Sequence, residues 1–138
     1  MKTKHKSIPK LKAEAWVVFS QYTRMRDCLK TQGTIDFGNC ITCSKLLRRT
    51  EGDAGHFISR RFSATFFDER NVHLQCKRCN GPLGGETLKY RREIIKLYGE
   101  GADIELEEKA TGIKKFTRDE LVELKAYYTE GIKKLKEV

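Results

Sequence analysis

Two Cys-x-x-Cys pairs constrain the fold of this chain more than any other feature of its sequence. Cys40 and Cys43 form the first pair, and Cys76 and Cys79 form the second. Four thiolates at this spacing are typical of a tetrahedral Zn²⁺ site closed by two short knuckles. We therefore expect a structural zinc, because a cation held by four thiolates keeps no open position for a reacting water.

The positive charge of the chain is concentrated in the part that contains these cysteines. The formal net charge is +9 over 138 residues, with +11 in residues 1–99 and −2 in residues 100–138. This distribution favours a polyanionic partner, and nucleic acid before a membrane, because no basic amphipathic helix with an aromatic face stands out. Solubility alone is the alternative explanation.

The sequence also predicts where the protein works. No apolar run approaches the length of a membrane span, and the lysine-rich residues 1–9 have no hydrophobic signal core behind them. We therefore expect a cytoplasmic protein that does not bind membranes, in which reducing conditions disfavour disulfides and favour metal binding by the paired cysteines. Cys28, the fifth cysteine, is expected to be a small buried apolar residue.

Apolar spacing predicts helices on both sides of the cysteine pairs. One helix covers residues 10–30 and stops before Gly33, with Trp16 and Phe19 as core anchors. A second covers residues 86–98 with Leu88 facing inward.

Two further helices are expected near the C-terminus. Asp103 can cap a short acidic helix that runs through residue 110. Thr117-Arg118-Asp119-Glu120 reads as a capping box and starts a last helix through residue 136.

Short strands are expected between the helices, at residues 34–39, 54–58 and 72–75, with a basic turn after the first cysteine pair. The connection over residues 59–70 is long for a small domain, and such connections are often functional. Phe62, Phe66 and Phe67 are expected to hold this connection to the core. The alternative is a mobile basic loop in which these phenylalanines are only partly buried.

Polar residues near the cysteines have the chemistry that phosphodiester cleavage needs. The neutral imidazole of His56 can take a proton from water near neutral pH, and the amide oxygen of Asn80 can bind Mg²⁺. From the residues alone, a structural role for His56, a capping role for Asn80 and a turn role for Asn71 remain open.

The order of these residues resembles a known group of nucleases. Gly55-His56 lies between the cysteine pairs, Asn71 precedes Cys76 by five residues, and Asn80 directly follows the last cysteine. This pattern resembles the HNH branch of the His-Me finger nucleases, in its zinc-bearing variety that includes phage endonuclease VII. It resembles the NinG (Rap) recombination proteins of phages more closely, and the resemblance covers nearly the whole chain from the first helix onward.

The resemblance implies an α+β fold, with a zinc-stapled ββα core of the treble-clef-like His-Me finger type and flanking N- and C-terminal helices. We divide the chain accordingly. Residues 1–33 form a basic arm and helix, residues 34–99 form the nuclease core, and residues 100–138 form a helical appendage, within one compact domain overall.

The resemblance also implies roles for individual residues. His56 is the general base, Asn71 holds the loop and orients His56, and Asn80 binds a catalytic Mg²⁺ or Mn²⁺. Many HNH enzymes carry an Asp where this chain has Gly55. We expect Asp53, on the same strand face, to replace it, so that Gly55→Asp would partly restore what Asp53→Ala loses. His73 is a weaker candidate ligand.

The implied substrate is branched DNA, namely Holliday junctions and D-loops, and the implied setting is phage recombination in the host cytoplasm. Phage or host recombination proteins are further candidate partners, and paired cuts would suit a homodimer. The expected DNA contacts are the basic residues near the finger: Lys45, Arg48, Arg49, Arg60, Arg61, Arg70, Lys77 and Arg78.

Two other functions remain open at this level. A zinc finger that binds DNA or RNA without cutting would explain the charge and the cysteines, but not Gly55-His56 and Asn80. A sequence-specific HNH nicking or restriction nuclease would apply the same chemistry to a different target.

Overall fold

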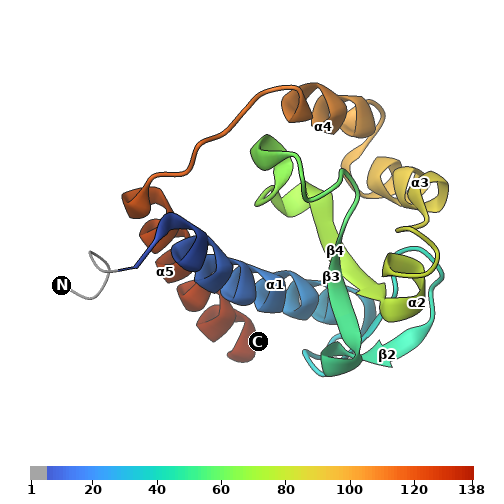
Figure 1. The fold of residues 1–138 in the computed structure, drawn as a ribbon. Coiled ribbons are helices and arrows are strands. Elements are labelled where there is room, and N and C mark those ends of the chain that lie inside the picture. The colour runs from blue at the N-terminus through green and yellow to red at the C-terminus, as the bar shows by residue number, and fades with distance from the viewer. Residues whose placement is uncertain (1–5) are drawn as a thin grey trace.

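The computed structural model describes residues 6–138 and shows within them a mixed α+β fold with five helices and two small antiparallel sheets (Figure 1). Residues 1–5 of the expected basic arm lie outside the described residues. In chain order the elements are α1 (Ile8–Gln32), β1 (Phe37–Asn39), β2 (Leu46–Arg48), β3 (Gly52–His56), β4 (Val72–Cys76), α2 (Lys77–Asn80), α3 (Thr87–Tyr98), α4 (Ala102–Ala110) and α5 (Arg118–Lys136).

Helix α1 is the element on which the others assemble, since it packs against both sheets and along α5. The Ser7 hydroxyl accepts a hydrogen bond from the Lys10 N–H at its start, and Gly33 ends it in the left-handed conformation with φ of 71°. The predicted first helix is confirmed and begins two residues earlier. Phe19 and Cys28 are buried as expected, whereas Trp16 is only half-buried.

The two sheets carry the cysteines at their ends. Strands β1 and β2 are joined by the first knuckle, and β4 leads directly into α2, which holds the second knuckle. The predicted basic turn is wrong in part, because Leu46–Arg48 pairs with β1 and Leu47 packs beside Leu74. Strand β3 begins two residues earlier than predicted, and its ladder with β4 runs from Gly52↔Cys76 to His56↔Val72.

Helices α3 and α4 differ in two details from the prediction. Leu88 is 77% exposed, because the inward face of α3 is formed by Tyr90 and Ile94 instead. Asp103 does not cap α4, since its carboxylate lies 2.7 Å from the guanidinium of Arg91.

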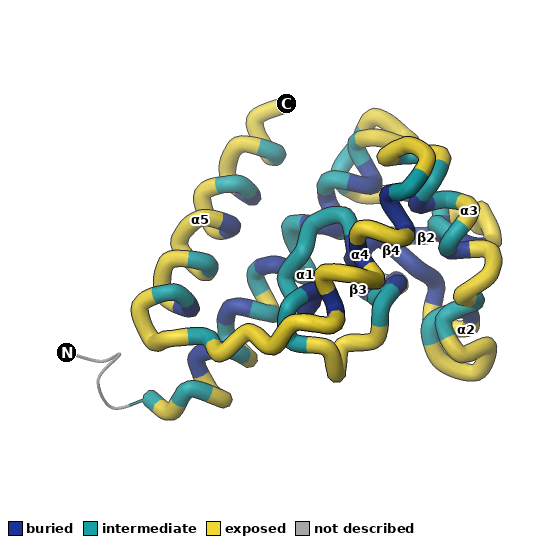
Figure 2. Tube along the Cα trace, turned by 90° about the horizontal axis from the view of Figure 1, so that it is seen from above, coloured by how far each residue is buried: buried dark blue, intermediate teal, exposed yellow. Residues whose placement is uncertain are grey.

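Helix α5 begins with the predicted capping box, in which Thr117 and Glu120 each accept a hydrogen bond from the other's backbone N–H. Its inner side packs along α1, where the rings of Tyr22 and Tyr128 lie 4.9 Å apart. Figure 2 shows that the outer side of α5 is exposed, whereas β4 is buried along its whole length. Among residues 6–138, no helix has the length and apolar character needed to cross a membrane.

Candidate functional site

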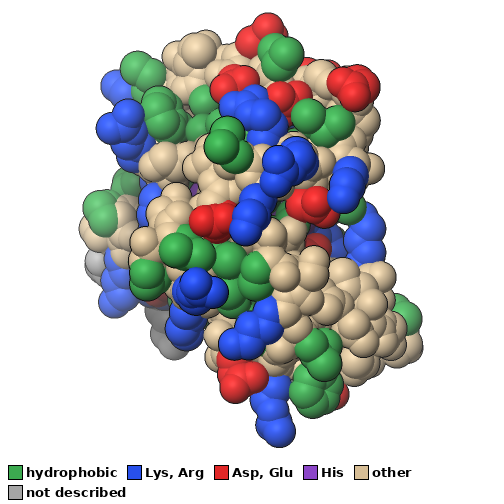
Figure 3. Space-filling model, turned by 90° about the vertical axis from the view of Figure 1, so that its right-hand side faces the viewer, with side chains coloured by type: hydrophobic (Ala, Val, Ile, Leu, Met, Phe, Trp, Pro, Cys, Tyr) green, Lys and Arg blue, Asp and Glu red, His purple; other side chains and the backbone are tan. Residues whose placement is uncertain are grey.

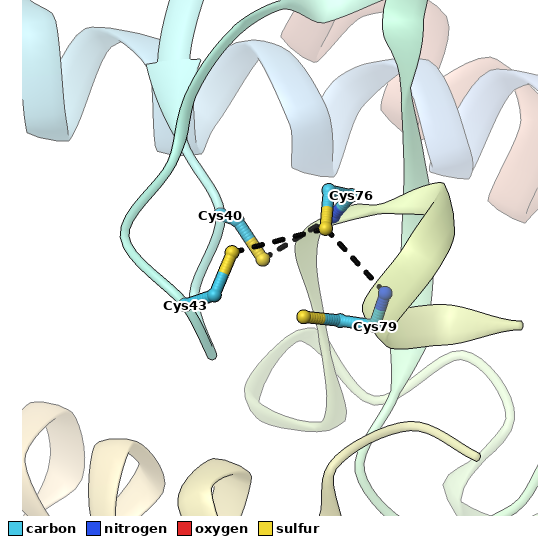
Figure 4. Close-up of side chains that lie close together, drawn as sticks. All are labelled: Cys40, Cys43, Cys76 and Cys79. Atoms are coloured by element: carbon cyan, nitrogen blue, oxygen red, sulfur yellow. Dashed lines mark hydrogen bonds between the residues drawn. The ribbon is translucent and has the colours of Figure 1, made fainter. Parts of the chain in front are cut away.

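The four paired cysteines meet at one point. Figure 4 shows two sulfurs approaching from the β1–β2 connection and two from the β4–α2 junction. All four Sγ atoms lie within 4.8 Å of one another, and those of Cys43 and Cys76 are 3.8 Å apart. Zn–S bonds of about 2.3 Å in a tetrahedron place sulfurs about 3.8 Å apart. The cluster could therefore hold a structural zinc ion.

Hydrogen bonds to the sulfur of Cys40 favour its thiolate form, whereas burial raises the pKa values of Cys43 and Cys79. The Cys76 N–H donates to Cys40 Sγ at 3.3 Å, and the Thr42 hydroxyl lies 3.4 Å from the same sulfur. Burial raises the pKa of the Cys40 thiol, but these hydrogen bonds outweigh it and bring the pKa down to about 6.

Asp53 and Asn80, which are 27 residues apart in the sequence, come into direct contact beside this cluster. The Asn80 side-chain amide donates to Asp53 Oδ2 at 3.1 Å. Two adjoining hollows on this surface share Ala54, Arg60 and Asn80. Asp53 lines one hollow and His56 lines the other, so Asp53, His56 and Asn80 together line a single groove.

The ring of His56 has a fixed orientation in this groove. It stacks on Trp16, with ring centroids 4.9 Å apart and planes inclined by 18°, and its Nε2 lies 3.0 Å from the Phe66 carbonyl oxygen. Because a carbonyl only accepts, Nε2 of the neutral ring carries the proton and Nδ1 is the proton acceptor. Burial lowers the pKa of His56 to about 4, and the nearby cations Arg60 and Lys12 act in the same direction.

Cationic side chains surround the Asp53 carboxylate. Lys77 Nζ lies 2.6 Å from Asp53 Oδ1, and Arg24 and Arg60 line the same hollow. Sequence reasoning missed Arg24, because it belongs to α1 and lies far from the finger in the sequence. It also took Trp16 for a core residue only, and helical spacing gives no sign of the stack on His56.

Asn71 fastens the long β3–β4 connection. Its side chain is fully buried, with Oδ1 accepting from the Ile58 N–H at 2.7 Å and Nδ2 donating to the carbonyls of Ile58 and Thr65 at 3.0 and 3.1 Å. Asn71 therefore holds the loop directly. Its link to His56 is indirect, because it binds the carbonyl of Thr65, and the carbonyl of the next residue, Phe66, contacts the His56 ring.

His73 lies away from the groove, in a buried chain of hydrogen bonds. The Tyr90 hydroxyl donates to the Gly55 carbonyl at 2.6 Å, so it accepts from His73 Nδ1–H at 3.1 Å. The Tyr98 hydroxyl then donates to His73 Nε2 at 2.7 Å. Because both ring nitrogens have partners, we do not count His73 among the candidate metal ligands of the groove.

The backbone at Gly55, where the resemblance to HNH nucleases leads one to look for an Asp, leaves little room for a side chain. A Cβ atom at this position would overlap the amide oxygen of Gln75, which is fully buried on the facing strand. The Gln75 amide nitrogen is itself fixed by the Thr42 hydroxyl and the Gly85 carbonyl. A side chain at position 55 would therefore force Gln75 to move, whereas Asp53, two residues earlier on the same strand, lines the groove without this conflict.

The predicted DNA contacts fall into two sets. Arg49 and Arg70 are engaged within the protein, with the Ile35 carbonyl at 2.9 Å and with Glu105 at 3.0 Å. The remaining six are exposed: Lys45, Arg48, Arg60, Arg61, Lys77 and Arg78. Figure 3 shows one face on which several acidic side chains lie at the top, while Lys and Arg side chains are spread over the whole face.

Comparison with curated proteins found relatives among phage proteins. Protein ninG of Escherichia phage 933W is 35% identical over 98 residues, which cover 70% of this chain and 48% of that protein. Protein ninG of Salmonella phage P22 is 34% identical over 101 residues, covering 71% and 48%. This chain spans about half the length of the curated relatives it matches.

Comparison with solved structures found no match. The family model described as Bacteriophage Lambda NinG protein matches residues 1–137, almost the whole chain. Protein ninG of Escherichia phage lambda itself is 34% identical over 98 residues, covering 70% of this chain and 47% of that protein. The chain belongs to the NinG family.

Proposed function

We propose that this chain is a metal-dependent DNA endonuclease of the His-Me finger type that acts on branched recombination intermediates. One observation carries the proposal: a fixed, neutral imidazole, a carboxylate and an amide line one groove. The order β3, β4, α2 supports it, because an antiparallel pair followed at once by a helix is the ββα arrangement expected of an HNH core.

The oxygens in the groove fit a hard divalent cation. Asp53 supplies a carboxylate. Asn80, whose amide nitrogen faces Asp53, would supply its amide oxygen once the amide group turns over. Mg²⁺ binds few protein oxygens while keeping several waters. The Lys77 ammonium already lies against Asp53, so the position attracts positive charge. A Mg²⁺ or Mn²⁺ ion held there would stabilise the negative charge that develops on the phosphate.

His56 is suited to activate the attacking water. Its Nδ1 is unprotonated at neutral pH, because the pKa of the ring is about 4 and Nε2–H is directed at Phe66. After Nδ1 takes a proton, the Phe66 carbonyl and the Trp16 ring face stabilise the imidazolium. Arg60 is exposed and placed to hold the phosphate that is cut. Arg24 adds positive charge to the same hollow, although its guanidinium already donates to the carbonyls of Ser20 and Arg49.

The choice of branched DNA rests on the resemblance to NinG recombination proteins, which also implies phage recombination in the host cytoplasm. The test compares a labelled four-way junction with a linear duplex of the same sequence, each incubated with the full chain with and without Mg²⁺. New ends on the junction that require Mg²⁺ are expected. Binding without new ends would indicate a non-cutting zinc finger, and equal cutting of both substrates would indicate a nuclease without structure selectivity.

A further inference from the structure

The start of the β3–β4 connection forms a tight turn beside the groove, which we call the prong (residues 59–62). The Phe62 N–H donates to the Ser59 carbonyl at 3.0 Å, and the Arg61 N–H lies 3.3 Å from the Ser59 hydroxyl oxygen. This turn places Arg60 and Arg61 at its tip. Ser59 and Arg60 line the groove together with His56 and Asn80.

The base of the prong is held at both ends. The Asn71 side chain binds both backbone groups of Ile58 on one side and the Thr65 carbonyl on the other. Thr65 and Phe66 are buried, so the segment that follows the prong is anchored in the core. The prong is therefore preorganised, and placing it against a ligand costs little conformational entropy.

An aromatic ring is exposed on this rigid turn. Phe62 is 36% exposed, whereas Phe66, four residues later, is 4% exposed. The guanidinium of Arg61 lies 4.9 Å from the centre of the Phe62 ring, and that of Arg60 lies 5.5 Å from the ring of Trp16. An exposed ring with a cation against it, and a second cation two residues before it in the chain, is a combination with which proteins stack on unpaired bases and hold the adjoining phosphates.

We infer that the prong recognises the branch point of DNA, with Phe62 stacking on a base and Arg60 and Arg61 contacting the adjoining phosphates. The inference rests on the proposed function for its ligand and names the feature that gives selectivity. Bases inside a continuous duplex are covered on both faces, so exposing one costs free energy. At a branch a base face is reached at lower cost, and the phosphate beside it then falls near His56.

Binding measured without Mg²⁺ tests the inference separately from cutting. A four-way junction carries 2-aminopurine at the branch, and a linear duplex of the same sequence serves as reference. We expect the full chain to prefer the junction and to raise its fluorescence. Phe62→Ala and Phe62→Leu should weaken junction binding by about 5- to 150-fold, the contribution of one stacked base. Their affinity for the duplex should change little, and neither variant should raise the fluorescence of the junction.

Phe37, on strand β1, provides a matched control. It is 40% exposed, and the Arg48 guanidinium lies 5.7 Å from the centre of its ring. Phe37→Ala should leave the junction preference unchanged, and Phe62→Trp should retain it. Zinc content and circular dichroism establish that each variant is folded.

Two failures can be told apart. The inference is overturned if the wild type shows no junction preference, or if Phe62→Leu keeps the wild-type preference even while the junction is cut. A wild type that prefers the junction through Phe62 but never cuts it with Mg²⁺ would instead contradict the proposed endonuclease alone.

Discussion

The imidazole of His56 lies nearly parallel to the indole of Trp16, at a centroid distance of 4.9 Å. This contact joins the end of β3 to the first half of α1, so the first helix takes part in the candidate active site. Together with the Phe66 carbonyl, it fixes the ring so that Nδ1 is its proton acceptor. The imidazole is therefore oriented by two aromatic residues that belong to other segments of the chain.

Removing the imidazole should stop cutting without releasing the DNA. For His56→Ala we expect the single-turnover rate to fall by about 10²- to 10⁴-fold, because general-base catalysis contributes about that much. Junction affinity should stay within a few-fold, since a base acts in the transition state more than in binding. A variant that cuts at the wild-type rate would exclude His56 as the base.

The half-buried His56 and the buried His73 should be neutral in opposite tautomers. We expect His56 as the Nε2–H form and His73 as the Nδ1–H form, which long-range ¹⁵N–¹H correlation spectra distinguish. Burial lowers their pKa values to about 4 and about 3, below the ordinary value of about 6.5. The unfolded chain then binds more protons, so the contribution of both rings to stability is full above about pH 6.5 and declines as the pH falls toward 3.

Finding both rings protonated at pH 6 would contradict this pair of assignments. His5 lies outside the described residues, and its signal should be assigned with a His5→Ala variant before the other two are interpreted.

Asp53 and Lys77 should affect the metal requirement in opposite directions. Asp53→Ala should raise the Mg²⁺ concentration for half-maximal cutting, because it removes a ligand. Lys77→Ala should lower it by about 1.4- to 5-fold, since an exposed ion pair of this kind contributes about 0.2–1 kcal/mol. Lys96→Ala is the control, as Lys96 is similarly exposed and pairs with Glu93 on α3. An unchanged Mg²⁺ requirement in Asp53→Ala would remove Asp53 from the ligand set.

Adding Gly55→Asp should not rescue Asp53→Ala, contrary to the expectation from the HNH pattern. The new side chain would collide with Gln75 and destabilise the β3–β4 pair. Thermal unfolding of Gly55→Asp alone measures this cost, and a stable variant that restores cutting would show that Gln75 can move aside.

Loss of a zinc ligand should unfold the finger. We expect one zinc per chain, and none in Cys40→Ser, because a structural zinc contributes about 10–16 kcal/mol whereas a domain is stable by about 5–15 kcal/mol. Cys28→Ala is the matched control, since Cys28 is a buried cysteine outside the cluster and should leave the zinc content at one. Brief chelation should stop cutting before zinc leaves, and added Mg²⁺ or Mn²⁺ should restore it.

An exposed arginine, Arg60, and an arginine engaged within the protein, Arg70, should differ in their effect on the salt dependence of DNA binding. Arg60→Ala should weaken binding and reduce the slope of log affinity against log salt by about one, as expected for one lost phosphate contact. Arg70→Ala should leave the slope unchanged, because Arg70 is paired with Glu105 and Asp68. Equal slopes for both variants and the wild type would exclude Arg60 as a phosphate contact.

The sequence by itself determined the features that depend on near neighbours in the chain. The two cysteine pairs predict the four-sulfur cluster, because ligand spacing within each knuckle is local. Gly33 and Thr117 mark helix ends for the same reason, since a left-handed residue and a capping box act within one turn. The order of Gly55-His56, Asn71 and Asn80 along the chain likewise indicates the NinG family, and the family comparison confirms it.

Tertiary structure decided which of these polar residues share a groove. Strand β4 is buried on both faces, so alternation along it gave no sign that His73 belongs to an internal network. The way α1 crosses β3 decides that Trp16 stacks on His56 and that Arg24 lines the groove. The strand register, which sets Gln75 across from Asp53, decides that a side chain at position 55 would overlap Gln75. Such contacts join residues far apart in the chain, so sequence periodicity, which reports only which side of an element is apolar, cannot specify them.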